Sequence, residues 1–563
     1  MEVQAPESVK RLDALYEFDR QPVTNDRLLG PAYFAGSYAG EHVAATEFVI
    51  GALFVSWGAG FSDILIGLAI GNLLAVLSWT LLCAPVAVET RLTLYWYLRK
   101  IGGPVFTLIY NVLNALLFCV LAGCMITVSA SAVRIPFGIP PQVDWYPTDL
   151  RFVLIVLLVG AVVVALAILG FKKLASFSTV CSPWMLLMFV SGAAVMLPVV
   201  GDAAGVGAID SWAALAEASR RVVWTGQTPD GSPPITLMQI AAFAWICNLA
   251  MHGGLSDMAL LRYARRASYG LFSAFGMFLG HYLAWICAGL MGGGVAVLLG
   301  RSLPQLDAGE VGFQALGWSG ILAVVIAGWT TSNPTLYRAG LALQAVTPNW
   351  SRARVTLVAG AVTTVIACFP FVFTRLLEFV GIYGLLLAPP GAIVLVEHWI
   401  FPLIGLQRYW AEQQKRALNV PAAVAWGVSI AMALALERSG TLHLFYLFVP
   451  TYLTAAVLYT ALAAMAGARQ VGGGQPQAAH QPSFREGPMP MSQPDGRGKS
   501  GGGLAGLVAL AALVVCLVLP LAAGFGYTSR EIVRAWLIVP TIVYFVSGVL
   551  FYRSWRDEQT GSA

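Results

Sequence analysis

The sequence predicts an all-α polytopic membrane protein, and this prediction rests on its composition and on the length of its apolar runs. Of the 563 residues, 58% are hydrophobic and only 11% are charged, and the mean hydropathy is +0.74. A water-soluble globule of this size needs far more polar surface. Apolar runs of about 20 residues, enough for a helix to cross about 30 Å of hydrocarbon, recur along the chain.

About fourteen of these runs are expected to be membrane-spanning helices. They lie near 28–57, 62–84, 104–133, 151–171, 174–199, 237–261, 269–299, 317–346, 354–374, 377–402, 421–436, 441–467, 503–524 and 535–552.

The basic residues indicate the orientation of these spans, because Lys and Arg collect in cytoplasmic loops. With the N-terminus inside, 23 of the 33 Lys and Arg residues fall in cytoplasmic segments, nine fall outside, and Arg338 remains within a span. Both termini are therefore predicted to be cytoplasmic. The net charge of +5 is explained by loops facing an anionic leaflet, so the expected partner is the lipid bilayer and no nucleic acid is required.

The composition divides the chain into four parts. Residues 1–27 form a polar cytoplasmic tail that lacks the apolar core of a secretory signal. Residues 28–467 form a core of about twelve spans. Residues 468–502 are rich in Gly, Pro, Gln and Ser and are predicted to be a flexible cytoplasmic linker. Residues 503–563 form a two-helix C-terminal appendix.

Two predicted spans are interrupted by polar and small residues near mid-membrane. Unwound backbone in lipid costs on the order of several kcal/mol for each unsatisfied N–H or C=O group, unless it is buried in protein or lines a cavity. Two interruptions far apart in the sequence therefore indicate a shared polar site, a pattern typical of secondary transporters. The first, within 28–56, contains Gly36, Ser37, Gly40, Glu41 and His42; the second, within 237–261, contains Asn248, His252, Gly253, Gly254, Ser256 and Asp257.

The interruptions occur at corresponding places in two sets of five spans of opposite orientation. The first and sixth spans each break after about ten residues. Ser182-Pro183 in the fifth span and Ala388-Pro389-Pro390 in the tenth lie at similar distances from the ends at which their spans begin. This arrangement suggests a five-plus-five inverted repeat.

Ionisable side chains at membrane depth are costly, so their positions point to function. Glu41 and His42 are expected at the amino end of a restarted half-helix, whose partial positive charge favours an anion or a polar ligand. They either bind a ligand or a proton, or they cap the half-helix and satisfy its backbone. His281 by itself favours a structural role. The other ionisable residues in broken spans are Glu47, His252 and Asp257.

The eighth predicted span contains hydroxyl groups beside a proline. Pro334 frees the carbonyl of Thr330, and the hydroxyls of Thr330 and Thr331 add hard oxygen ligands that suit a small alkali cation. The alternative is that these hydroxyls bond only to carbonyls of their own helix.

Aromatic and amide side chains flank the interruptions. Trp245 stands one turn before the break in the sixth span, and Tyr110, Asn114 and Phe118 lie along the third span. Such a set suits a flat heterocycle, with stacking supplying contact area and amides fixing orientation. The alternative is ordinary core packing.

These motifs together resemble the nucleobase:cation symporter-1 family, the permeases for cytosine, purines, uracil, allantoin and hydantoins, over about residues 28–467. The resemblance implies the LeuT-type fold of five-plus-five inverted repeats. It is carried by Ala327-Gly-Trp-Thr-Thr-Ser-Asn333, by Trp245, Asn248, Asp257 and Arg262-Tyr263, by Gly170-Phe-Lys-Lys173 with Ser182-Pro183, and by Ala388-Pro389.

The resemblance also implies two binding sites. The cation, sodium or proton, is expected between the first and eighth spans, with candidate sodium ligands at Ser37, Gly40, Ala327, Thr330 and Thr331. The substrate is expected between the first, third, sixth and eighth spans. Its candidate contacts are Glu41, His42, Asn114, Phe118, Trp245 and Asn248. The chain departs from hydantoin carriers at Phe118 and Asn114, where a tryptophan and a glutamine are seen.

The expected function is cation-coupled symport of a small polar heterocycle across the plasma membrane by alternating access, with no cofactor beyond the coupling ion. Two other readings stay open: an amino-acid or betaine-like carrier on the same fold, and a membrane sensor that binds without translocating. An enzyme is not expected, because HExxH does not occur and the carboxylates are not paired on one helix face with a histidine at ligand spacing.

Overall fold

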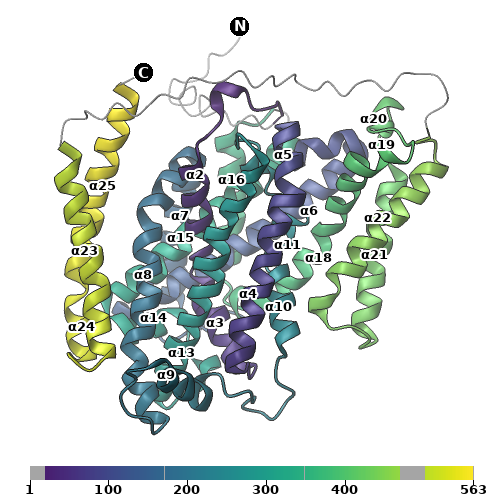
Figure 1. The fold of residues 1–563 in the computed structure, drawn as a ribbon. Helices are drawn as coiled ribbons and strands as arrows, with labels where there is room; N and C mark the ends of the chain where they lie inside the picture. The colour runs from purple at the N-terminus through teal and green to yellow at the C-terminus, as the bar shows by residue number, and fades with distance from the viewer. Residues whose placement is uncertain (1–19, 170, 348, 470–500, 562–563) are drawn as a thin grey trace.

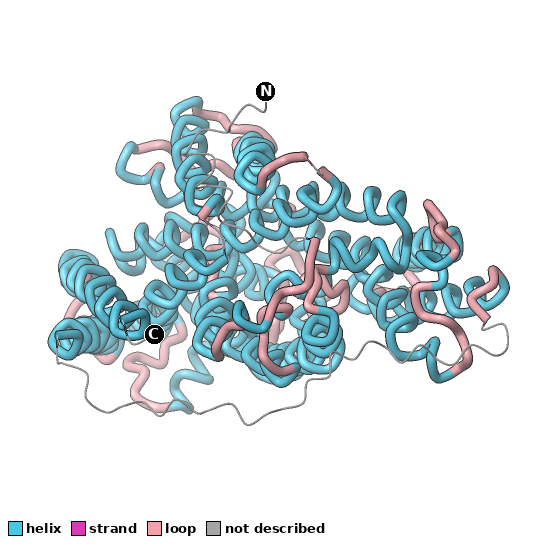
Figure 2. Tube along the Cα trace, turned by 90° about the horizontal axis from the view of Figure 1, so that it is seen from above, coloured by secondary structure: helices cyan, strands magenta, loops and turns pink. Residues whose placement is uncertain are grey.

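The computed structural model describes residues 20–169, 171–347, 349–469 and 501–561, which form a bundle of long helices with a separate helix pair at one side (Figure 1). Within these ranges the regular structure is helical, and the loops join helix ends (Figure 2). Among the described residues, ten helices are long and apolar enough to cross a membrane. The predicted all-α polytopic class is confirmed. Most of the predicted tail and linker lies outside the described residues.

The number of crossings stays a prediction, because four of the fourteen expected spans are shorter, less apolar or interrupted. They are the two broken spans and the helices α15 (Trp318–Val346) and α16 (Arg352–Ala367). The first half of the core comprises α2 (Pro31–His42), α3 (Thr46–Ser56), α4 (Phe61–Ser78), η2 (Trp79–Cys83), α5 (Ala84–Thr90), α6 (Leu94–Val133), α7 (Leu150–Ile168), α8 (Phe171–Ala203) and α9 (Trp212–Ala218).

The second half of the core continues the same alternation of long and interrupted helices. It comprises α10 (Leu237–Ile246), α11 (Leu249–His252), α12 (Met258–Leu261), η6 (Phe275–Ala284), α13 (Trp285–Leu299), α14 (Ala308–Leu316), α15 (Trp318–Val346), α16 (Arg352–Ala367), α17 (Phe371–Thr374), α18 (Leu376–Leu395), η8 (Val396–Ile400), α19 (Phe401–Leu403), α20 (Trp410–Gln413), α21 (Val420–Arg438), η9 (Leu444–Tyr446) and α22 (Phe448–Met465).

The helix contacts repeat with an offset of five spans. The second half of the first span, α3, packs on the seventh span, α13, and the first half of the sixth span, α10, packs on the second, α4. Likewise α2 packs on the fifth span, α8, and α11 packs on the tenth, α18. The third and eighth spans, α6 and α15, pack on each other, as do the fourth and ninth, α7 and α16. This pairing is that of two interlocked five-helix repeats.

Glycines allow the closest helix contacts in this core. A Cβ added at Gly320, near the start of α15, would lie less than 2.5 Å from the carbonyl oxygen of Gly312 in α14. Small residues at such contacts let helix backbones approach, which is a main source of packing energy in membranes.

Gly320→Ala is expected to destabilise the protein by about 1–3 kcal/mol, because the backbone atoms it meets cannot move aside cheaply. The measurement is the thermal unfolding midpoint of detergent-purified protein. Gly427→Ala in α21 is the matched control: its new Cβ meets nothing within 4 Å, so that variant should be neutral or slightly more stable. Equal midpoints for the two variants would contradict the packing assignment.

The C-terminal appendix comprises α23 (Gly501–Gly524), α24 (Arg530–Trp536) and α25 (Ile538–Gly561), which Figure 1 shows in yellow-green beside the core. It is hydrogen-bonded to the core. The Trp184 indole of α8 donates to the Thr541 hydroxyl at 3.2 Å, and that hydroxyl lies 3.1 Å from the hydroxyl of Ser319 in α15. The Tyr544 hydroxyl donates to the Val180 carbonyl at 2.6 Å. The appendix is therefore fixed to the fifth and eighth spans.

Candidate functional site

The first broken span is interrupted at residues 43–45, later than predicted. Helix α2 continues through Gly36, Gly40 and Glu41 to His42, and α3 restarts at Thr46. Glu41 and His42 therefore end the first half-helix and do not begin the second. This corrects the expectation that a helix amino end faces these side chains.

The glycines of α2 serve packing, which explains the correction. A Cβ at Gly36 would lie 2.5 Å from the hydroxyl of Thr179, and one at Gly40 would lie within 3 Å of the hydroxyls of Ser178 and Ser182. All three hydroxyls belong to α8. Glycine at these positions lets α2 lie directly against the fifth span without unwinding.

The second broken span is interrupted where the sequence predicted. Helix α10 ends at Ile246, α11 covers only Leu249–His252, and α12 restarts at Met258. Between α11 and α12, Leu255 adopts a positive φ of 62°. A left-handed apolar residue is strained and persists only where the surrounding structure holds it, a situation common at functional sites.

One arginine joins the two breaks. Arg338 of α15 donates to both oxygens of Glu41, at 2.5 Å and 3.1 Å, and to Asp257 at 2.5 Å. The same Asp257 accepts the Tyr38 hydroxyl and the Trp79 indole, each at 2.7 Å. The side chains of Glu41, Asp257 and Arg338 are all at most 3% exposed. The two interruptions therefore meet through a buried ion triad.

The triad was only partly foreseeable from the sequence. Glu41 and Asp257 stood out as carboxylates at membrane depth, and Arg338 stood out as the one basic residue within a predicted span. A buried arginine nearly always has an acidic partner. That rule, applied to Arg338, would have paired it with the two carboxylates. When both carboxylates are ionised, they share one guanidinium and keep one negative charge between them.

A central cavity of about 40 Å³ lies beside the triad, between the first, third, sixth, seventh, eighth and tenth spans. Space of this size holds a few water molecules. The amide nitrogen of Asn248 is buried there without a hydrogen-bond partner, so it is a free donor at the cavity wall. The lining residues are Glu41, His42, Thr46, Glu47, Ile50, Leu121, Met125, Cys247, Asn248, Met251, His281, Thr331, Thr335, Leu376, Val380 and Tyr383.

Three of the six predicted substrate residues line the central cavity, and the other three lie outside its lining. Glu41, His42 and Asn248 line the central cavity. Phe118 packs edge-on against the cavity residue Tyr383, with ring centroids 5.6 Å apart, and Asn114 is fully buried with both amide atoms unpaired.

Trp245 is the third predicted substrate residue that lies outside the cavity lining. Its indole donates to the hydroxyl of Ser78 at 3.0 Å, and its ring packs on Phe448 with centroids 5.0 Å apart. In this conformation Trp245 connects the sixth span to the second and twelfth.

Three of the five predicted cation ligands, Ala327, Thr330 and Thr331, lie at the contact between α2 and α15. The Thr331 hydroxyl lies 2.7 Å from the Glu41 carbonyl and 3.2 Å from the Ala327 carbonyl, and the Thr330 hydroxyl lies 3.1 Å from the Ala327 carbonyl. These atoms form an all-oxygen set of the kind that hard cations prefer. The α2 carbonyl facing Thr331 is that of Glu41. Ser37 and Gly40, by contrast, lie within the continuous part of α2.

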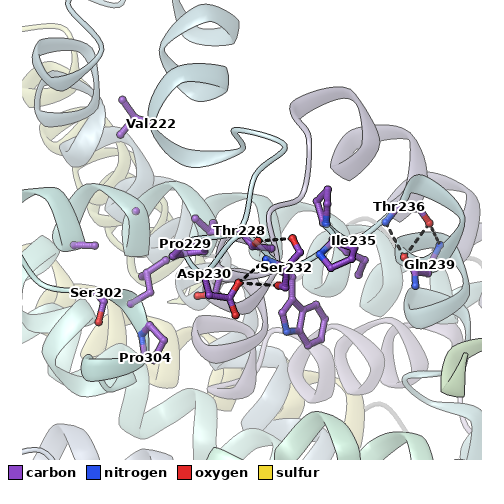
Figure 3. A pocket seen from close by; sticks show the side chains of 18 of the residues that line it. Val222, Thr228, Pro229, Asp230, Ser232, Ile235, Thr236, Gln239, Ser302 and Pro304 are labelled. Carbon is purple, nitrogen blue, oxygen red and sulfur yellow. Dashed lines mark hydrogen bonds between the residues drawn. The ribbon is translucent and has the colours of Figure 1, made fainter. Parts of the chain in front are cut away.

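A larger cavity of about 1100 Å³ opens on the side predicted to be external (Figure 3). Residues of the 228–236 loop, together with Gln239 of α10, form much of its wall. The Asp230 carboxylate accepts hydrogen bonds from the Ser232 amide at 3.1 Å and from the Ser232 hydroxyl at 2.7 Å. We refer to this cavity as the vestibule. Trp57 and Phe445 also line it.

Aromatic rings lie between the vestibule and the central cavity. Phe243 packs on Phe445 with centroids 5.1 Å apart and on Phe54 at 5.6 Å, and Phe54 packs on Trp285 at 5.7 Å. The Trp285 indole in turn donates to Glu47, which lines the central cavity. This aromatic layer separates the two spaces in this conformation.

Two titratable groups at the vestibule have shifted pKa values. Hydrogen bonding from the Ser232 hydroxyl lowers the pKa of Asp230, so its carboxylate is ionised at neutral pH. Partial burial lowers the pKa of His443, so its ring is neutral at neutral pH. The charged residues that line the vestibule are thus two acids, Asp230 and Glu378, and one base, Arg301.

Comparisons with known proteins agree with this arrangement. No protein-family model and no curated protein sequence matches the chain. Among solved structures, the chain is similar to Mhp1, a nucleobase-cation-symport-1 family transporter, in a closed conformation with bromovinylhydantoin bound. The TM-score is 0.61 at 18% identity, covering 80% of this chain and 96% of Mhp1.

Two further structures give the same result. The inward-facing conformation of Mhp1 matches with a TM-score of 0.58 at 18% identity, covering 80% of this chain and 95% of Mhp1. A Na⁺-coupled sialic acid symporter in a substrate-bound, outward-open state matches with a TM-score of 0.55 at 15% identity, covering 81% of this chain and 96% of the symporter. The core of this chain therefore has the LeuT-type fold of Mhp1.

Proposed function

We propose that this protein is a symporter of the nucleobase:cation symporter-1 family, which carries a small polar heterocycle together with sodium across the plasma membrane. The observation that carries the proposal is the meeting of two broken helices at a central cavity. Glu41 and Asn248 bring one polar group from each break to that cavity, and Thr331 adds a hydroxyl from the eighth span. Such a mid-membrane site suits alternating access.

The cavity offers the chemistry that a nucleobase requires. The free amide nitrogen of Asn248 donates a hydrogen bond, and the Glu41 carboxylate accepts one from a ring or exocyclic N–H. Phe118 and Tyr383 supply aromatic surface nearby. The similarity to Mhp1, whose structure contains bromovinylhydantoin, supports a flat heterocycle as the substrate class.

Sodium is proposed to bind between the Glu41 and Ala327 carbonyls and the hydroxyls of Thr330 and Thr331. The Thr331 hydroxyl connects the two helices directly, and a cation at this position would replace that single contact with several. One charge moving across 100 mV supplies about 2.3 kcal/mol, enough for roughly 50-fold accumulation of a neutral solute.

A carrier of amino-acid-like or betaine-like solutes is the second candidate. The triad of Glu41, Asp257 and Arg338 favours it, because its uncompensated negative charge would attract a cationic amino group. In this case the substrate, not only the coupling ion, would neutralise the triad.

The test is uptake into proteoliposomes that contain the purified protein. A thermal-shift screen of nucleobases, hydantoins and amino acids, with and without sodium, first identifies stabilising ligands. Radiolabelled cytosine is then expected to accumulate only under an inward sodium gradient. Accumulation of amino acids alone would favour the second candidate, and ligand binding without accumulation would indicate a sensor.

A further inference from the structure

A second ionisable site lies in the central cavity, apart from the triad and the proposed sodium ligands. Glu47 is the second residue of α3, and its side chain is 3% exposed. Its carboxylate accepts the indole N–H of Trp285 and the hydroxyl of Thr46 at 3.5 Å. Its position at the start of a helix places it near the positive end of the helix dipole.

Histidine is the nearest ionisable partner of this carboxylate. His281 Nε2 lies 3.7 Å from Glu47 Oε1, and the His281 side chain is 4% exposed. The ring is held in place by stacking on Trp285, with centroids 4.3 Å apart and planes at 14°. The other ring nitrogen of His281 is buried without a hydrogen-bond partner. The pair therefore has an unused proton-binding position at the cavity wall.

Among the described residues, the lining of the cavity around the pair contains no Lys or Arg. The titratable groups that share the cavity with Glu47 and His281 are Glu41, His42, Cys247 and Tyr383. Arg338, the cation beside this region, already donates to Glu41 and Asp257. Among the described residues no three His, Cys, Asp or Glu side chains converge to hold a metal. An ionised carboxylate buried in this way is costly, and binding a proton removes the cost.

We propose that Glu47 and His281 form a proton-binding site, and that a proton is transported with the substrate in each cycle. This inference rests on the proposed transport function and adds a second coupling ion to it. When the cavity opens outward, a hydronium ion from the external water gives up its proton, an O–H bond forms at Glu47, and a neutral water molecule is released. When the cavity opens inward, that bond breaks and the proton passes to cytoplasmic water. His281 is a positioning residue that orients the carboxyl and shares its proton.

The experiment measures proton movement and substrate exchange separately. Proteoliposomes contain the pH dye pyranine, with equal pH on both sides, and cytosine is added outside. The wild-type protein is expected to acidify the lumen as cytosine enters. Exchange is measured as uptake of radiolabelled cytosine against unlabelled cytosine inside, a process that requires no net proton transfer.

Glu47→Gln is expected to reduce cytosine-driven acidification about tenfold or more while exchange persists, because glutamine has a similar shape and cannot release a proton. Glu531→Gln is the matched control: its side chain is 69% exposed in the appendix, and both readouts should equal those of the wild type. Undiminished acidification by Glu47→Gln overturns the inference. Loss of exchange together with acidification in a properly folded variant also overturns it, because that result indicates a structural role.

His281→Gln provides the second measurement and decides the matter if Glu47→Gln does not fold. It keeps the carboxyl and removes the ring that shares its proton. The pH at which acidification is half maximal is expected to shift, and an unchanged pH profile overturns the inference. A wild-type protein that exchanges cytosine without acidifying the lumen contradicts only the proton site, whereas one that does neither contradicts the proposed function itself.

Discussion

Replacing Arg338 with alanine is expected to prevent the protein from accumulating in folded form. The substitution leaves Glu41 and Asp257 buried without their cation, and removing one partner of a buried ion pair typically costs about 3–5 kcal/mol. Folded proteins are stable by only about 5–15 kcal/mol, so this loss is a large share of the total. The measurement is the yield of monodisperse protein and its thermal unfolding midpoint.

Two further variants separate charge from side-chain size in this prediction. Arg375→Ala removes an arginine whose partner, Glu378, is exposed, and surface pairs contribute about 0–1 kcal/mol, so this variant should resemble the wild type. The triple variant with Arg338→Met, Glu41→Gln and Asp257→Asn removes all three charges and should recover much of the lost stability. A stable Arg338→Ala protein would contradict the triad as an essential contact.

Thr331→Ala is expected to raise the sodium concentration for half-maximal cytosine uptake about tenfold or more. The substitution removes the hydroxyl that contacts the carbonyls of Glu41 and Ala327. An interaction with a charged group contributes about 1.5–3 kcal/mol, which corresponds to roughly 10-fold to 150-fold in affinity. The measurement is initial uptake rate over a range of sodium concentrations at fixed cytosine and fixed pH.

Thr460→Ala is the control for the sodium prediction. The Thr460 hydroxyl bonds to the carbonyl of Ala456 within α22, so its loss removes a similar helix contact far from the proposed ion. Its sodium dependence should match the wild type. Identical sodium dependence for Thr331→Ala and the wild type would refute the assignment of Thr331 as a ligand.

The sequence was informative wherever the membrane makes polar residues costly. The interrupted sixth span, the carboxylates Glu41 and Asp257, and the hydroxyls Thr330 and Thr331 all stood out because lipid penalises them, and the structure places them close to one another. The LeuT-type fold was implied by the family resemblance in the same segments, and the similarity to Mhp1 confirms it.

Other features could not be read from the sequence, because they depend on neighbours from distant segments. Glycine permits both unwinding and close packing, and only the hydroxyls of α8 beside Gly36 and Gly40 show that it serves packing here. The direction of Trp245 likewise depends on Ser78 and Phe448.

The hydrogen bonds of the Thr541 hydroxyl affect which backbone amides open, and exchange their hydrogens, first. It is hydrogen-bonded to Trp184 in α8 and to Ser319 in α15, so the appendix connects two helices that are far apart in the sequence. Hydrogen bonds tolerate only a few tenths of an ångström of stretch before they weaken. Backbone amides around Thr541, Trp184 and Ser319 should therefore be among the last to exchange with deuterium, while those around the interrupted helices exchange early.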